Sequence, residues 1–148
     1  MSASTQQNHI SLSARTCWLL ILAALVFALL CYPLYQNNVE RQTHKEAIKA
    51  LNKAARLQEQ YFETNGVYTD QVKELGLPAS GGASSFMSAN WQYRIKIELS
   101  VRNGKSYYVL TTLPYGEGAD QRTVYHLESG GEKSHQLPGQ ALVSGWGV

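Results

Sequence analysis

The chain has few cysteines and few charges. Its two cysteines, Cys17 and Cys31, are separated in a helix by about 21 Å of rise, which is far beyond disulfide reach. Both are therefore interpreted as small apolar residues. Charged residues make up 16% of the 148 positions, below the roughly 25% of an ordinary soluble domain. The net charge of +2 is too small to imply nucleic-acid binding.

The sequence also lacks the short motifs that carry much catalytic chemistry. It has no Gly-x-Ser-x-Gly, no phosphate-cradling glycine loop and no Cys-x-x-Cys. We therefore expect a protein that is not an enzyme and that holds no cofactor.

The best candidate for a metal site is a set of two histidines and two carboxylates. His126 and Glu128 share one face of a predicted strand, and Glu132 and His135 follow. Such residues can bind a metal, but their spacing matches no common ligand pattern and a Gly-Gly turn lies between them. A solvated hairpin is the favoured interpretation, and no metal is expected.

Aromatic and basic residues interleave between residues 91 and 96, which can indicate binding of single-stranded nucleic acid. Trp91 and Tyr93 alternate with Arg94 and Lys96, so in a strand the two kinds of side chain point to opposite faces. This pattern is typical of core-facing aromatics with a solvated back. No nucleic acid is expected as a partner.

Apolar residues are abundant near the N-terminus. The nineteen residues from Cys17 to Tyr35 carry no charge, and about 20 apolar residues are needed to cross a bilayer. A signal peptide has a shorter apolar core with small residues before its cleavage site. Residues 17–35 are therefore predicted to be a retained transmembrane half-helix after a polar segment, residues 1–16. Arg15 precedes the span, and Arg41, Lys45 and Lys49 follow it. This excess of positive charge places the C-terminal side in the cytoplasm, but the counts are small and the opposite orientation is favoured.

The helix is predicted to continue beyond this span. Residues 39–62 contain neither Gly nor Pro, and good helix formers dominate. Apolar residues follow helical spacing, which is typical of a helix packed on its own domain: Ile48, Leu51, Ala54, Ala55, Leu57, Tyr61 and Phe62. Pro33 is expected to bend the helix without ending it, and Asn65-Gly66 is expected to cap it.

After this helix, the pattern predicts a small antiparallel sheet. A short helix is expected over 69–75 and a loop over 78–85. The apolar period then changes to two, which predicts strands at 91–101, 106–113 and 123–128, with another near 141–143. Asn103-Gly104, between the first two strands, is a strong hairpin signal.

Together these elements define an α+β fold. A long N-terminal helix, with a membrane-spanning first half and an amphipathic second half, packs on a sheet of three or four antiparallel strands. Residues 36–148 form the head, which includes the second half of the helix.

Two segments resemble the type IV pilins. Pro33-Leu34-Tyr35-Gln36 is similar to the Pro-x-Tyr-Gln that ends the apolar helix in this family. Residues 54–62, followed by 65–69, resemble the family's helix end and following loop. The resemblance covers residues 17–78 well and the remainder in outline, and it implies a divergent minor pilin or pseudopilin with a pilin-like fold.

Two features of that family are missing from the chain. Pilins are normally trimmed after a Gly that precedes a Phe-Thr-Leu-Ile-Glu-like start. Alignment on Pro33 places the processing site at Ser11-Leu12 and that Glu near Thr16, beside Arg15. An unpaired charge in an apolar core costs on the order of several kcal/mol, so Arg15 beside this position opposes ordinary packing of the helix in a fibre. The disulfide that is common in such heads is also absent.

The resemblance implies a minor pilin-like subunit of a type IV pilus or a type II secretion fibre. It implies a bacterial inner-membrane protein whose head lies in the periplasm, with membrane lipid, other pilin-like subunits and the assembly machinery as partners. The missing processing signature suggests an alternative, a membrane-anchored accessory protein that does not polymerise. A third hypothesis is a membrane-tethered enzyme or metal binder that uses His126 and His135.

Overall fold

The computed structural model describes the backbone of residues 14–146 and the side chains of residues 17–31 and 39–146. The chain divides into two compact units, Met1–Val39 and Glu40–Val148. Helix α1, Ala14–Asn65, contributes its first part to one unit and its second part to the other.

In the first unit, every described side chain of α1 from Cys17 to Cys31 is exposed. Within the described residues, no helix is both long enough and apolar enough to cross a membrane. The predicted span of residues 17–35 is therefore not confirmed, and its last four residues lie outside the described side chains. Helix α1 includes Pro33, so the proline does not end the helix, while the bend predicted there stays a prediction.

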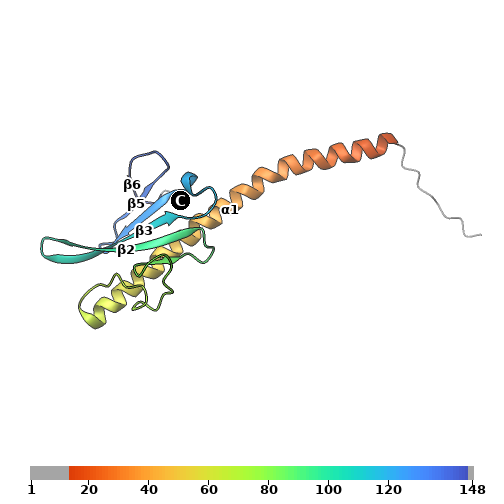
Figure 1. The fold of residues 1–148 in the computed structure, drawn as a ribbon. Helices are drawn as coiled ribbons and strands as arrows, with labels where there is room; N and C mark the ends of the chain where they lie inside the picture. Colours follow the sequence, from red (N-terminus) through yellow and green to blue (C-terminus); the bar gives the residue numbers. More distant parts are fainter. Residues whose placement is uncertain (1–13, 147–148) are drawn as a thin grey trace, which may run out of the picture. The chain divides into compact units, whose positions relative to one another are not determined.

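The second unit contains a six-stranded antiparallel sheet in which each strand pairs with its neighbour in the sequence (Figure 1). The strands are β1 (Ser85–Met87), β2 (Tyr93–Arg102), β3 (Lys105–Pro114), β4 (Val124–Glu128), β5 (Lys133–Gln136) and β6 (Val143–Ser144). A short 3-10 helix, η1 (Ala119–Gln121), lies between β3 and β4. The α+β fold with an antiparallel sheet is confirmed.

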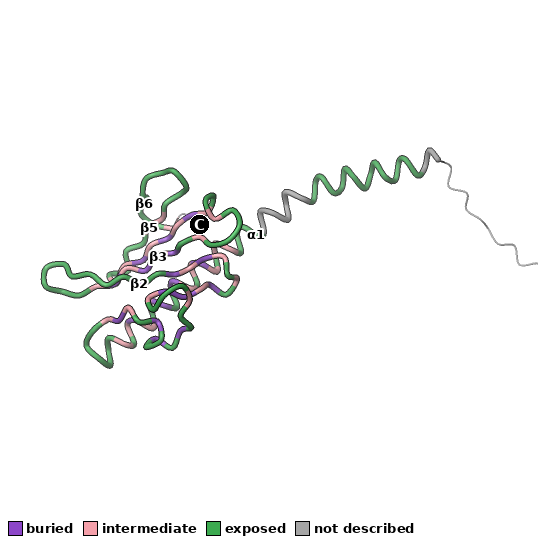
Figure 2. The backbone as a smooth tube through the Cα atoms, viewed as in Figure 1, coloured by how far each residue is buried: buried purple, intermediate pink, exposed green. Residues whose placement is uncertain are grey.

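The hairpin of β2 and β3 turns at Asn103-Gly104, as predicted. Both residues have positive φ, 55° and 73°, the conformation that this two-residue turn requires. The outer part of the hairpin, residues 98–106, is entirely exposed (Figure 2). Leu99 and Val101 continue the alternating apolar pattern of the predicted strand 91–101, which predicts that they face the core, but they lie beyond it, with exposed fractions of 44% and 67%.

The core lies between one face of α1 and one face of the sheet. The helix supplies Ala47, Leu51 and Ala54, spaced by three and four residues, and the polar Gln58 continues the same buried face. The strands supply the aromatic and aliphatic side chains that face it: Phe86, Tyr93, Ile95, Ile97, Tyr108, Leu110, Tyr125 and Leu127. Of the predicted apolar stripe on the helix, Phe62 is instead 38% exposed.

The segment between α1 and the sheet differs from the prediction. Helix α1 ends at Asn65, and Gly66 has φ 72°, so the predicted cap is confirmed. Residues 69–75, however, form turns and not a helix. The Thr69 hydroxyl accepts a hydrogen bond from the Gln71 N–H at 3.0 Å, a local bond that competes with helix formation.

Two strands were absent from the predicted sheet. Strand β1 begins at the end of the expected loop 78–85, and its three residues pair with β2. Strand β5 is polar and pairs with β4, so it forms the second arm of the solvated hairpin that was expected at His126 and His135. Both form through backbone pairing with a longer neighbour, so neither needs a hydrophobic period of its own.

Candidate functional site

Five basic side chains follow one face of α1 in the second unit: Arg41, Lys45, Lys49, Lys53 and Arg56. The first four recur every fourth residue, which is about 6 Å of helical rise per step. Each residue turns a helix by about 100°, so this series lies roughly opposite the buried face. The basic face is therefore directed away from the sheet.

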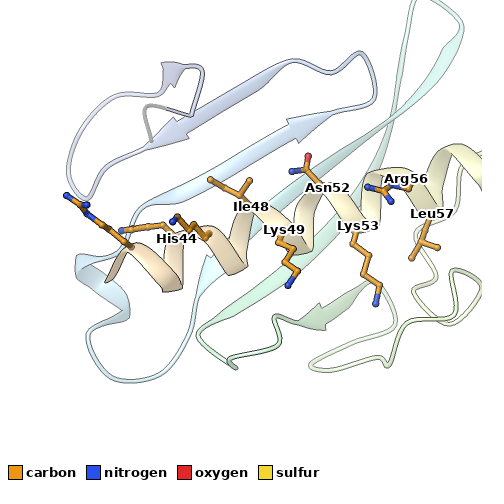
Figure 3. Close-up of a pocket in the computed structure, with 9 residues that line it drawn as sticks. His44, Ile48, Lys49, Asn52, Lys53, Arg56 and Leu57 are labelled. Atoms are coloured by element: carbon orange, nitrogen blue, oxygen red, sulfur yellow. The ribbon is translucent and has the colours of Figure 1, made fainter. Parts of the chain in front are cut away.

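An open groove of about 1170 Å³ runs along this face and is lined by α1 residues alone (Figure 3). Besides the five cations, its lining consists of His44, Ile48, Asn52 and Leu57. The residues form two rows with four-residue spacing, one from position 44 to 56 and one from 41 to 57. Rows of this kind are ridges, and the space between two ridges is a groove.

The charges of the groove are largely uncompensated. Lys49 Nζ lies 3.5 Å from Glu46 Oε1, which is a long and exposed contact. The other four cations form no ion pair or hydrogen bond with any residue whose side chain the structure describes. The groove thus combines several positive charges that have no partner among the described side chains with a partly apolar lining.

Cations on the sheet are instead mostly engaged. Lys96 Nζ lies 2.6 Å from Glu98 Oε1. Three others are stacked on aromatic rings, at 4.7–5.1 Å from the ring centroid: Arg94 on Tyr115, Arg102 on Tyr107 and Lys133 on Trp146. Free positive charge is therefore concentrated along α1.

His44 lies at one end of the groove and joins it to the sheet. Its Nδ1 lies 2.8 Å from the hydroxyl of Tyr125, and the two rings meet edge to face. Burial lowers the pKa of His44, Glu40 opposes that shift and Arg122 adds to it. The imidazole is therefore neutral at neutral pH, and in one tautomer its Nδ1 accepts the hydrogen bond from Tyr125.

The predicted metal candidates do not come together. In the register, His126 is opposite Ser134 and His135 is opposite Tyr125, so the two histidines occupy opposite faces of the sheet. His126 Nδ1 lies 3.1 Å from the Thr111 hydroxyl, and His135 Nδ1 lies 2.6 Å from the Gly145 carbonyl oxygen. Among the described residues, no group of three or more His, Cys, Asp or Glu side chains is placed to hold a metal, Glu128 and Glu132 included.

Trp91 and Tyr93 also separate. Tyr93 is fully buried, as predicted, but Trp91 precedes β2 and is 65% exposed. The prediction of a core-facing Trp91 is wrong, because its backbone takes a positive φ and leaves the strand alternation. Arg94 and Lys96 do lie on the opposite side of β2 from Tyr93.

The basic face of α1 was not predicted. In the sequence its cations indicate only a helix and charges that flank the predicted span. Their four-residue spacing is visible in the sequence, but a whole-chain net charge of +2 conceals it, since acidic residues elsewhere balance them. The predicted processing site, Ser11-Leu12, lies outside the described residues.

Comparison with known families now identifies the class of protein. Residues 33–123, well over half of the chain, match a family of type IV minor pilins, and the chain belongs to that family. The family is described as type IV minor pilin ComP, DNA uptake sequence receptor. No curated protein matches the chain.

The family match confirms the resemblance to the type IV pilins. It also requires a correction, because a family described as a DNA receptor conflicts with the expectation that no nucleic acid is a partner. That expectation rested on the net charge and on residues 91–96, and neither reports the local concentration of charge on α1.

Proposed function

We propose that this protein is a minor subunit of a type IV pilus and that its head binds DNA along the basic groove of α1. The observation that carries the proposal is the row of five cations, four of them without a described partner, in a chain of a family described as a DNA uptake sequence receptor. The role is binding and assembly rather than catalysis.

The charge spacing suits the DNA backbone. From Arg41 to Arg56 the helix rises about 22 Å, which is about two-thirds of a turn of B-DNA. Each phosphate neutralised by Lys or Arg releases condensed counterions, so affinity falls steeply with salt. Five such contacts predict a slope of about −4.5 for the logarithm of the association constant against the logarithm of salt concentration.

The proposal is tested with a charge-neutralised groove. Arg41, Lys45, Lys53 and Arg56 are replaced together by Gln in the full chain in detergent, and binding to a duplex of about three turns is measured over a range of salt. We expect weaker binding and a slope of about −1. The side chains are exposed, so the fold should be retained.

A second variant with the same change in net charge provides the control. It replaces Lys73, Lys96, Arg102 and Lys105 by Gln, all of which lie outside the groove. We expect a smaller loss of affinity than in the groove variant. Equal losses would show that only total charge matters, and the groove assignment would fail.

The shape of the groove favours a second candidate role. Two parallel ridges with a groove between them can also accept the ridge of another helix, and pilin-like subunits must pack on one another in a fibre. In this case the groove variant would enter fibres poorly while binding DNA normally. Measuring its abundance in sheared fibres beside its DNA affinity separates the two roles.

We also propose that residues 17–35 anchor the protein in the bacterial inner membrane with the head on the periplasmic side. The apolar run supports this, while the missing processing signature supports the alternative of an anchored accessory protein that stays out of the fibre. Mass spectrometry of the N-terminus decides between them. A chain that begins near Leu12 in sheared fibres indicates a processed subunit, and a full-length chain confined to membranes indicates the accessory protein.

A further inference from the structure

Trp91 combines two unusual properties. Its side chain is 65% exposed, and its backbone φ is +58°. A residue with a large side chain is disfavoured in this left-handed region because its Cβ crowds the backbone. Strained conformations of this kind are concentrated at ligand-binding and catalytic positions.

The turn that carries Trp91 is fixed by hydrogen bonds at both ends. Two hydrogen bonds join Ser88 and Tyr93. The Ser88 N–H donates to the Tyr93 carbonyl at 2.8 Å, and the Tyr93 N–H donates to the Ser88 hydroxyl at 3.0 Å. The Trp91 N–H donates to the Ser88 carbonyl at 3.0 Å, and Asn90 Oδ1 accepts from the Ser88 hydroxyl at 2.7 Å. These bonds therefore fix the backbone at Trp91, whose indole is largely exposed.

A second exposed aromatic and two arginines flank this turn. The N–H of Tyr115, a residue that is 48% exposed, donates to the carbonyl of Gln92 at 2.8 Å, directly after Trp91. The guanidinium of Arg94 lies 5.1 Å from the centroid of the Tyr115 ring. Arg122 Nη1 donates to the carbonyls of Gln92 and Tyr115 at 3.4 and 2.8 Å.

The same arginine connects this corner to the basic groove. Arg122 is close enough to His44, at one end of the groove, to lower its pKa. Tyr125, three residues after Arg122, bonds to the His44 ring at 2.8 Å. Trp91 thus lies at the same end of the sheet as the contact between Tyr125 and His44, the histidine at one end of the groove.

We propose that Trp91 is an aromatic contact to the nucleobases of DNA whose backbone lies along the groove. This inference rests on the proposed function. An exposed indole beside cationic side chains provides a stacking surface for a base, and apolar side chains can also be wedged between base steps of a duplex. In both cases Trp91 contacts a nucleobase, which is supplied either by single-stranded DNA or by a duplex.

Three variants of the full chain test the inference. Asn tolerates positive φ well, so Trp91→Asn should leave the melting temperature unchanged or raise it while weakening DNA binding about tenfold or more. Trp91→Phe keeps an aromatic ring and should bind within a few-fold of the natural chain. Val101→Asn, at the other end of β2 and 67% exposed, should bind normally.

Binding is measured with single-stranded and duplex DNA of the same sequence. A loss in Trp91→Asn confined to single strands identifies stacking on unpaired bases, and a loss with the duplex identifies a wedge at a base step. Normal binding by Trp91→Asn, where the groove variant binds weakly, would overturn the inference and leave the proposed function standing. A defect only in fibre entry would assign Trp91 to a protein contact, and failure of the natural chain to bind DNA would refute both.

Discussion

The side-chain amide of Gln58 pairs with the backbone of Thr69 through both of its ends. Gln58 Nε2 donates to the Thr69 carbonyl oxygen, and the Thr69 N–H donates to Gln58 Oε1 at 3.2 Å. Gln58 is fully buried and Thr69 is 6% exposed. The pair therefore attaches the loop after α1 to the buried face of that helix, and it satisfies two backbone groups that water cannot reach.

Replacing Gln58 by Leu should destabilise the head strongly. The change keeps the volume but leaves the Thr69 N–H and carbonyl without partners, which predicts a loss of about 2–4 kcal/mol in the free energy of unfolding. Urea unfolding of the full chain measures it. Gln60→Leu, at an exposed position of the same helix, is the control and should change stability by less than about 0.5 kcal/mol.

Two buried tyrosines should respond oppositely to loss of their hydroxyls. The Tyr108 hydroxyl donates to Glu59 Oε1 at 2.9 Å, whereas the Tyr93 hydroxyl is buried without a partner among the described residues. Tyr108→Phe should cost about 1–2 kcal/mol, and Tyr93→Phe should be neutral or stabilising by about 1 kcal/mol. Equal effects in urea unfolding would contradict the assigned hydrogen bonds.

The same residues predict sensitivity to alkaline pH. Burial raises the pKa of both Tyr93 and Tyr108, and for Tyr108 the bond to Glu59 adds to the shift. Above about pH 10, the unfolded chain loses protons that the folded chain retains, so the free energy of unfolding decreases as pH rises. Tyr93→Phe should reduce that decrease, which is measured as the slope of stability against pH.

His44 predicts a loss of stability on the acidic side. Its pKa is lowered from 6.5, chiefly by burial, so below that pH the unfolded chain binds a proton that the folded chain does not. The contribution is complete above about pH 6.5 and is lost as pH falls through the folded pKa. His44→Gln should be less stable at neutral pH, because the bond to Tyr125 changes, yet less pH-dependent between about pH 7.5 and 5.5.

Urea unfolding across that range measures the difference. His135→Gln is a suitable control, since its ring contacts the Gly145 carbonyl rather than the helix. If the two variants have the same pH dependence, the contact between His44 and Tyr125 does not determine it.

Local signals made part of the fold predictable. Asn103-Gly104 identified the hairpin because only a few residue types accept positive φ at both positions, and Asn65-Gly66 identified the helix end for the same kind of reason. Strand β1 could not be predicted, since it forms by backbone pairing with β2 and has no hydrophobic period of its own. The polar strand β5 was recognisable only as the second arm of the hairpin that it forms with β4. The prediction that Trp91 faces the core was wrong because an alternating pattern cannot reveal a residue that leaves the strand conformation.

The basic groove was only partly predictable. The spacing of Lys45, Lys49 and Lys53 is present in the sequence, but a solvated helix face often carries such charges. Its significance depends on which charges remain unpaired, and this is set by tertiary structure. Cations of the sheet contact Glu98 and aromatic rings, whereas four cations of the groove have no partner among the side chains that the structure describes.

The proposed anchor makes a last prediction about the first unit. Leu22→Arg and Val26→Arg, combined in one chain, place two charges one turn apart in the middle of the apolar run, and each should cost about 2.5–3.5 kcal/mol of membrane insertion. After alkaline carbonate extraction, the natural chain should stay with the membranes and the double variant should be released. Val101→Arg, on the exposed hairpin, is the control and should remain membrane-bound. Release of the natural chain by carbonate would refute the anchor and leave the head's DNA binding to be judged separately.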